Sequence, residues 1–159
     1  MKRQLTSFKV AFWGIGYTLT AEPHMRFHLV ISIYVIAFAN FFHMTPEKWS
    51  ILFLTAGGVM ITEMFNTAVE VICDLQTGSY HPLVKIIKDI SSGAVLIAAL
   101  VSVAVAFFLF GDMKVIGGIV LFFRQNPGSF VLFALSLIVS AAFVLYGPLK
   151  IKTFFIKKQ

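Results

Sequence analysis

Long stretches without a charged residue dominate this chain and limit what it can fold into. No Asp, Glu, Lys or Arg occurs in Phe27 to Pro46, Trp49 to Thr62, Ile90 to Phe110 or Ser129 to Tyr146. A helix needs about 20 predominantly apolar residues to cross a bilayer, and only helices or closed barrels satisfy their backbone groups there. We therefore predict an all-α integral membrane protein whose second spanning helix runs from Trp49 to Asp74.

The composition agrees with a membrane protein that has no separate soluble domain. Hydrophobic residues make up 58% of the 159 residues, and the mean hydropathy is +0.89. Such values are typical of integral membrane proteins. The net charge of +6 comes from basic residues near the ends of the apolar stretches, which favours anionic lipid headgroups over nucleic acid as partners.

The N-terminal residues predict a helix that lies at the membrane surface. From Gln4 to Tyr17 apolar side chains recur at helical spacing, while Lys2, Arg3 and Lys9 carry charge. This segment is too short and too charged to span, so we predict an interfacial amphipathic helix. The helix should end before Glu22-Pro23, because a proline disfavours helical geometry at the preceding residue.

The chain divides into a unit of residues 1–112 and an extension of residues 113–159. Val115 to Phe123 is apolar but too short to span, so it is either interfacial or re-entrant. Ser129 to Tyr146 is long enough to be a fourth spanning helix, and a basic tail follows it. We expect the extension to serve in packing or anchoring.

The distribution of Lys and Arg predicts the orientation in the membrane. A four-span arrangement places ten of the 13 on the side of the N-terminus and only Lys48, Lys114 and Arg124 on the other. Since basic residues are enriched on the cytoplasmic side, the N-terminus is expected to be cytoplasmic.

Four polar residues in the second spanning segment are the strongest functional signal. Glu63, Asn66, Glu70 and Asp74 fall within about 80° of arc on one helix face. Ionisable residues at membrane depth are costly, and three carboxylates on one face repel one another unless a cation lies between them. The acidic stripe, as we call these four residues, therefore predicts a metal site.

The surroundings of the acidic stripe favour phosphoryl transfer to a lipid. Lys85, Lys88 and Asp89 follow one turn later in the sequence, so carboxylates and lysines at one depth could hold Mg²⁺ and nucleotide phosphates. Glu63 lies near the headgroup layer and could accept a proton from a lipid hydroxyl. No P-loop sequence occurs in the chain.

Less specific explanations exist for several of these residues. Asp74 alone could be a solvated helix end, but Glu63 lies about 16 Å deeper along the helix. Asn66 and Thr67 are equally typical of hydrogen bonds between membrane helices. His81 is ordinary for an interfacial loop.

The motif Glu63-x-x-Asn66-Thr67-Ala68-Val69-Glu70-x-x-x-Asp74, with Tyr80-His81 and Lys88-Asp89-x-x-Ser92, resembles the prokaryotic diacylglycerol kinase and undecaprenol kinase family. The upstream Glu22-x-x-x-Arg26-x-His28 fits as well, and the resemblance covers residues 5 to 110. It implies a homotrimer in a bacterial cell membrane, built from a surface helix and three spanning helices. Each active site would be shared between subunits and face the cytoplasm.

The resemblance also implies roles for individual residues. Glu63 matches the catalytic proton acceptor, and Ser92 matches a position near the lipid substrate. Glu22 and Glu70 match the carboxylates that bind Mg²⁺ together with ATP. The remaining matches to the nucleotide site are Arg3, Asn66, Asp74, Tyr80, His81, Lys88 and Asp89.

The chain departs from the family pattern in two respects. The diacylglycerol-specific branch has an acidic residue where this chain has His28, which favours undecaprenol as the acceptor and leaves diacylglycerol as the alternative. The family pattern ends near Phe110, whereas this chain continues to Gln159.

The sequence thus predicts an ATP-dependent membrane lipid kinase. A function of another class is an oligomeric proton or cation pathway lined by Glu63, Glu70 and Asp74. Such a pathway needs polar groups across the whole membrane, and Trp49 to Thr62 carries no charge.

Overall fold

A computed structural model describes residues 2–76 and 81–148, with the side chains of all of these except Lys2, Arg3 and Gln76. The described residues form α1 (Lys2–Ala21), α2 (Pro23–Ala39), η1 (Asn40–Phe42), α3 (Pro46–Gln76), α4 (Pro82–Phe110), α5 (Met113–Gln125) and α6 (Pro127–Tyr146). Among them, four segments are long and apolar enough to cross a membrane, namely Pro23–Phe42, Pro46–Leu75, Pro82–Phe110 and Pro127–Tyr146. The predicted all-α membrane fold is confirmed.

Proline begins each of these four spanning helices. A proline at the first helical position fits because the N–H group that it lacks would have no partner there. The helices consequently start earlier than their uncharged stretches. In particular, α2 begins at Pro23, so Arg26 lies inside the helix and does not precede it.

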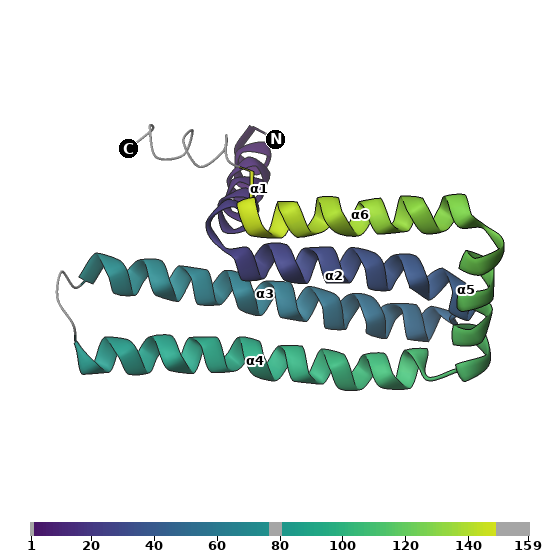
Figure 1. Ribbon diagram of the computed structural model, residues 1–159. Helices are drawn as coiled ribbons and strands as arrows, with labels where there is room; N and C mark the ends of the chain where they lie inside the picture. The colour runs from purple at the N-terminus through teal and green to yellow at the C-terminus, as the bar shows by residue number, and fades with distance from the viewer. Residues whose placement is uncertain (1, 77–80, 149–159) are drawn as a thin grey trace.

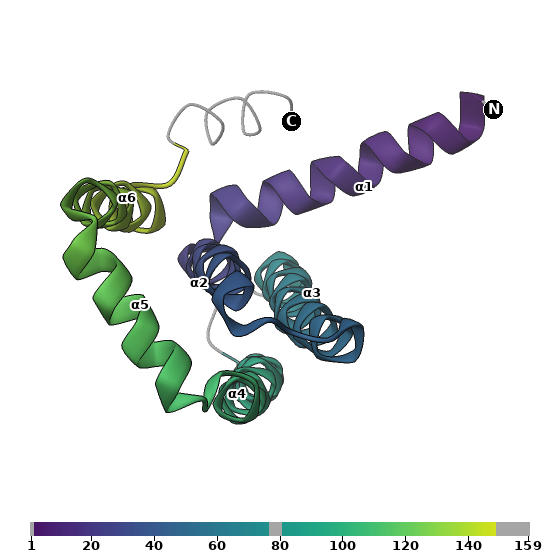
Figure 2. The ribbon, with the colours of Figure 1, turned by 90° about the vertical axis from the view of Figure 1, so that its right-hand side faces the viewer.

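The spanning helices lie roughly side by side, with α2 packed between α3 and α6 (Figures 1 and 2). Helices α3 and α4 form a long antiparallel pair of 31 and 29 residues. At 1.5 Å per residue they are about 46 and 44 Å long, whereas the hydrocarbon core is about 30 Å thick. Their joined ends extend past the level at which α1 leaves the bundle (Figure 1).

The short apolar segment Val115 to Phe123 lies within α5, which runs across one end of the bundle from α4 to α6 (Figures 1 and 2). This crosswise direction is the one expected of an interfacial helix and disfavours the re-entrant alternative. Aromatic contacts of Phe123 with Phe38 and Phe133 tie α5 to α2 and α6.

Little of the apolar surface is buried within the single chain. A small cluster of Ala39, Leu52 and Leu109 is buried where α2, α3 and α4 meet near α5. Most other large apolar side chains are exposed, as expected for helices that face lipid or other subunits. Polar contacts between helices are therefore important for their relative positions within the chain.

Candidate active site

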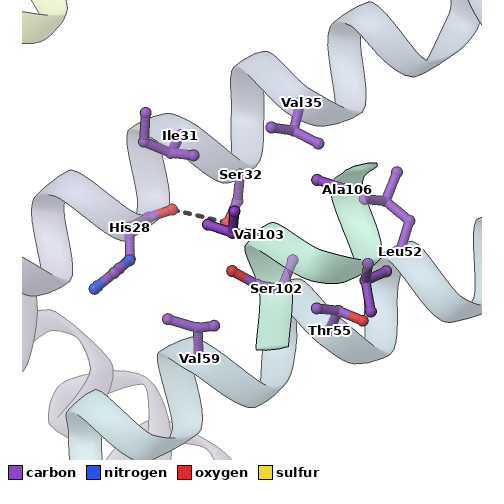
Figure 3. Close-up of a pocket in the computed structure, with 12 residues that line it drawn as sticks. His28, Ile31, Ser32, Val35, Leu52, Thr55, Val59, Ser102, Val103 and Ala106 are labelled. Carbon is purple, nitrogen blue, oxygen red and sulfur yellow. Dashed lines mark hydrogen bonds between the residues drawn. The ribbon is translucent and has the colours of Figure 1, made fainter. Parts of the chain in front are cut away.

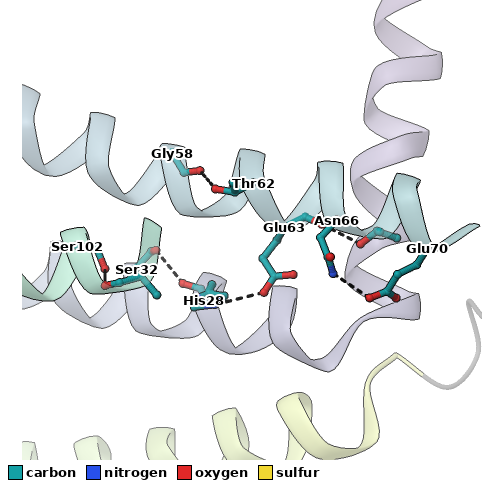
Figure 4. A network of polar contacts seen from close by, with 10 residues as sticks. His28, Ser32, Gly58, Thr62, Glu63, Asn66, Glu70 and Ser102 are labelled. Carbon is teal, nitrogen blue, oxygen red and sulfur yellow. Dashed lines mark hydrogen bonds and ion pairs between the residues drawn. The ribbon is translucent and has the colours of Figure 1, made fainter. Parts of the chain in front are cut away.

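A buried carboxylate lies at the contact between α2 and α3. Glu63 of α3 is only 3% exposed, and its Oε1 atom lies 3.4 Å from Nε2 of His28 on α2 (Figure 4). A buried carboxylate is costly unless another group supports it, and His28 is that group here. The sequence gives no sign of this contact, since His28 and Glu63 lie 35 positions apart on different helices.

One turn further along α3, Asn66 supports a second, more accessible carboxylate, that of Glu70. Its Nδ2 atom donates a hydrogen bond to Oε1 of Glu70 at 2.9 Å, and the neighbouring Thr67 hydroxyl donates to the Glu63 carbonyl at 3.0 Å (Figure 4). The Oδ1 atom of Asn66 is buried and has no hydrogen-bond partner among the described residues. An acceptor left in this state favours binding of a ligand or metal ion, because an unmet hydrogen bond costs about 1–3 kcal/mol.

Glu22 occupies the corner between α1 and α2 and is near enough to Glu70 for the two charges to interact. It is the one residue between these helices and has extended geometry, with φ −108° and ψ 118°. Partial burial raises the pKa of the Glu22 carboxyl, and the Glu70 carboxylate raises it further, while His24 and Arg26 oppose the shift. The fold therefore brings together two carboxylates whose repulsion a cation would relieve.

The residues at this corner suit a hard divalent cation that arrives with phosphates. Glu22, Glu70 and the free Asn66 oxygen are the oxygen donors that Mg²⁺ prefers. Within residues 2–76 and 81–148, no three His, Cys, Asp or Glu side chains converge on one point. Two carboxylates completed by phosphate oxygens and water match the usual way in which Mg²⁺ is held.

The four side chains of the acidic stripe do not converge on one point in the described part of the chain. Asp74, at its far end, contacts the Nζ atom of Lys88 on α4, and Lys85 pairs with Asp89 at 2.6 Å. Glu63 pairs with His28, and Glu70 accepts from Asn66. Helix α4 and the half-buried His28 supply partners that the sequence of α3 alone does not reveal.

Four other predicted nucleotide-site and lipid-site residues lie at the start of α4 or along it, namely His81, Lys88, Asp89 and Ser92. His81 caps α4, accepting a hydrogen bond at Nδ1 from the Leu83 amide, and Ser92 is exposed on the same helix. Tyr80 and the side chain of Arg3 lie outside the described residues.

An apolar pocket begins at His28 and extends between α2, α3 and α4 (Figure 3). Its volume is about 130 Å³, and apolar side chains such as Val35, Leu52 and Ala106 form most of its lining. An apolar space beside a buried carboxylate suits a substrate that has a long hydrocarbon chain and one reactive polar group.

Most of the chain is similar to known proteins. The family model for prokaryotic diacylglycerol kinase matches residues 9–110, which leaves α5 and α6 outside the matched region. A diacylglycerol kinase of Synechocystis sp. is 41% identical over 102 residues, or 64% of this chain and 58% of that protein.

Two further relatives carry related names. The undecaprenol kinase of Bacillus subtilis is 34% identical over 110 residues, covering 69% of this chain and 89% of that protein. A diacylglycerol kinase of Helicobacter pylori is 27% identical over 57% of this chain and 73% of its own length. With the family model matching well over half of its residues, this chain belongs to the prokaryotic diacylglycerol kinase family.

Proposed function

We propose that this protein is a membrane lipid kinase that transfers the γ-phosphate of ATP to the hydroxyl group of a lipid alcohol. The observation that carries the proposal is the position of Glu63. This buried carboxylate lies between the apolar pocket that begins at His28 and the polar corner formed by Glu22, Asn66 and Glu70. A kinase for a lipid must bring together these two environments.

In the proposed reaction, the lipid oxygen attacks the γ-phosphorus and the bond to the bridging oxygen of ADP breaks. Glu63 accepts the hydroxyl proton, and His28 holds that carboxylate in place. Bound with ATP, Mg²⁺ would neutralise charge on the phosphate oxygens. Glu22, Glu70 and the Asn66 Oδ1 atom are the groups that would hold it.

Lys88 is proposed to act on the nucleotide from α4. Its pairing with the 71% exposed side chain of Asp74 is a surface contact, which contributes little to stability in proteins generally. The ammonium group can therefore exchange this partner for a phosphate at small cost. We assign His81 and Asp89 to the same nucleotide region, along with Arg3 and Tyr80, and Ser92 to the lipid.

The preferred acceptor in this proposal is undecaprenol, with diacylglycerol as the alternative. The relatives are named for both activities, so the choice depends on residues of this chain. His28 contacts the proposed catalytic carboxylate, at the position where the diacylglycerol-specific branch is expected to be acidic.

We also propose a cytoplasmic site shared within a homotrimer. The excess of Lys and Arg on the side of the N-terminus supports this orientation. The exposed apolar faces of α3 and α4 support contacts with other copies of the chain.

A cation pathway through the bundle is less well supported. Beyond His28, the hydroxyl groups of Ser32, Thr55 and Ser102 donate hydrogen bonds to backbone carbonyls of their own helices. Such local bonds are the common state of serine and threonine in membrane helices and do not form a polar path.

Replacement of Glu63 by Gln tests the proposed function. The amide keeps the size of the side chain but cannot accept the hydroxyl proton. We expect phosphorylation of an added polyprenol to fall to background, while binding of a non-hydrolysable ATP analogue stays within about twofold of the wild type, as for a group that acts mainly in the transition state. Glu47→Gln, at the other end of α3, is the matched control and should retain full activity.

Equal loss of nucleotide binding and turnover in Glu63→Gln would show that Glu63 is a structural or metal-binding residue. Full activity of this variant would contradict the proposed chemistry.

An assay with both lipids decides the acceptor. We expect magnesium-dependent transfer of labelled phosphate to undecaprenol to exceed transfer to diacylglycerol in mixed micelles. Faster transfer to diacylglycerol would reverse the assignment without affecting the proposed reaction type.

A further inference from the structure

A single arginine joins the C-terminal extension to the corner of the active site. Arg26 of α2 is 4% exposed, and its Nε atom donates a hydrogen bond to the Val144 carbonyl at 3.0 Å. Its Nη1 atom donates to the carbonyls of Leu19 and Thr20, each at 3.1 Å. The guanidinium group therefore contacts α1, α2 and α6 at once.

The three carbonyls belong to the last turns of α1 and α6. Carbonyls in a final helical turn lack partners within the helix, and the helix dipole makes this end partially negative. A guanidinium group is suited to such a place because it presents several donors in a fixed plane and stays charged. Arg26 thus caps two helices that are far apart in the sequence.

The backbone immediately after α6 is shaped to pass over this guanidinium group. Gly147 has φ +61° and ψ −179°, a conformation that is essentially restricted to glycine. A Cβ atom at this position would lie 2.9 Å from Nη1 of Arg26 and 3.0 Å from its Cζ atom. Both the conformation and the space at Gly147 therefore require glycine.

Glu22 lies in the sequence between the carbonyls of Leu19 and Thr20, which Arg26 contacts, and Arg26 itself. Its amide donates to the Thr18 carbonyl at 2.9 Å, and it is the single non-helical residue between α1 and α2. Arg26 fixes α1 through Leu19 and Thr20 on one side of this residue and belongs to α2 on the other. A change in the angle at this corner would move Glu22 relative to Glu70 on α3.

We propose that α6 is a positioning element of the active site, which acts through Arg26 to hold Glu22 in place for the divalent cation. We call the contacts of Arg26 with Leu19, Thr20, Val144 and Gly147 the clasp. This inference rests on the function proposed above. Arg26 is a positioning residue in it, since it acts through Glu22.

The test uses the full-length chain in lipid nanodiscs and measures Mn²⁺ binding by electron paramagnetic resonance with a non-hydrolysable ATP analogue present. Gly147→Ala and Arg26→Gln should each weaken Mn²⁺ binding about tenfold, the usual effect of losing a group that orients a metal ligand. The Mg²⁺ concentration for half-maximal turnover should rise in parallel, and excess Mg²⁺ should restore most of the turnover.

The matched control is Gly128→Ala in the first turn of α6, where an added Cβ meets no atom within 4 Å. This variant should bind Mn²⁺ like the wild type. Arg26→Lys keeps the positive charge, but its compact ammonium group cannot reach both helix ends. Arg26→Lys should weaken Mn²⁺ binding as much as Gly147→Ala does. It serves in place of Gly147→Ala if that variant does not fold.

Wild-type Mn²⁺ affinity in both Gly147→Ala and Arg26→Lys would overturn the inference. Lower turnover that excess Mg²⁺ does not restore, with unchanged Mn²⁺ affinity, would also overturn it, because the clasp would then be structural only. A wild-type protein that neither binds Mn²⁺ with the nucleotide nor phosphorylates a lipid would instead refute the proposed function.

Discussion

At the scale of single residues, the contact between His28 and Glu63 determines the state of the proposed catalytic carboxylate. Glu63 is buried, and among the described side chains His28 is the one within ion-pair distance of it. An aliphatic residue at position 28 would leave the carboxylate without this support. An unsatisfied buried polar group costs about 1–3 kcal/mol, and more if it is charged.

We expect His28→Leu to lower turnover at least tenfold, because a rise of roughly 1.4 kcal/mol in the activation free energy lowers a rate by a factor of ten. His28→Gln retains a hydrogen-bond donor and should recover part of this loss. Steady-state kinetics with a polyprenol acceptor measures both variants. Equal activities of the Leu and Gln variants would show that the donor at position 28 is irrelevant.

At the scale of elements, hydroxyl groups connect α6 to α2 at a second place besides the bond from Arg26 to the Val144 carbonyl. The Tyr34 hydroxyl lies 2.9 Å from Ser136 Oγ and 3.0 Å from Ser140 Oγ. The Ser136 hydroxyl also donates to the Phe133 carbonyl at 2.7 Å. Hydrogen bonds between membrane helices supply direction where apolar packing does not.

Tyr34→Phe should lower the free energy of unfolding by about 0.6 kcal/mol, the mean for a hydrogen bond between membrane helices. Reversible unfolding in mixed micelles with increasing dodecyl sulfate measures the change. Tyr146→Phe is the control, since Tyr146 is 70% exposed and its replacement should have no effect. A stability change of equal size in the two variants would contradict the role of Tyr34.

At the scale of the whole molecule, the chain consists of the family unit in residues 1–112 and the extension in residues 113–159. This division remains a prediction, supported by the family match to residues 9–110. The proposed catalytic and metal-binding side chains all belong to α2, α3 and the corner before α2. The extension contributes α5 across one end of the bundle and α6 beside α2 (Figure 2).

A chain that ends at Asp112 should therefore keep measurable kinase activity. This truncation removes Val144 and Gly147, two of the four residues that Arg26 contacts in the clasp, so its Mg²⁺ requirement should exceed that of the full chain. Turnover at several Mg²⁺ concentrations measures both effects. A truncated protein that folds but has no activity at any Mg²⁺ concentration would show that the extension belongs to the site itself.

Local sequence pattern was sufficient to predict the all-α membrane fold and its four spans. Helix type and length follow from runs of apolar residues, and the helical period alone places Glu63, Asn66 and Glu70 on one face. These properties depend on residues that are close in the sequence. The same pattern could not show that Asp74 contacts Lys88, because Lys88 comes from another helix.

The tertiary structure alone decided which residues serve Glu63 and Glu22. His28 and Glu63 meet through the packing of α2 on α3, and Arg26 bonds a carbonyl 118 positions away. In the sequence, Arg26 is only the charged residue that precedes the uncharged stretch from Phe27. Apolar helix faces can pack in several ways, so periodicity determines each helix and its polar face but leaves open which faces meet.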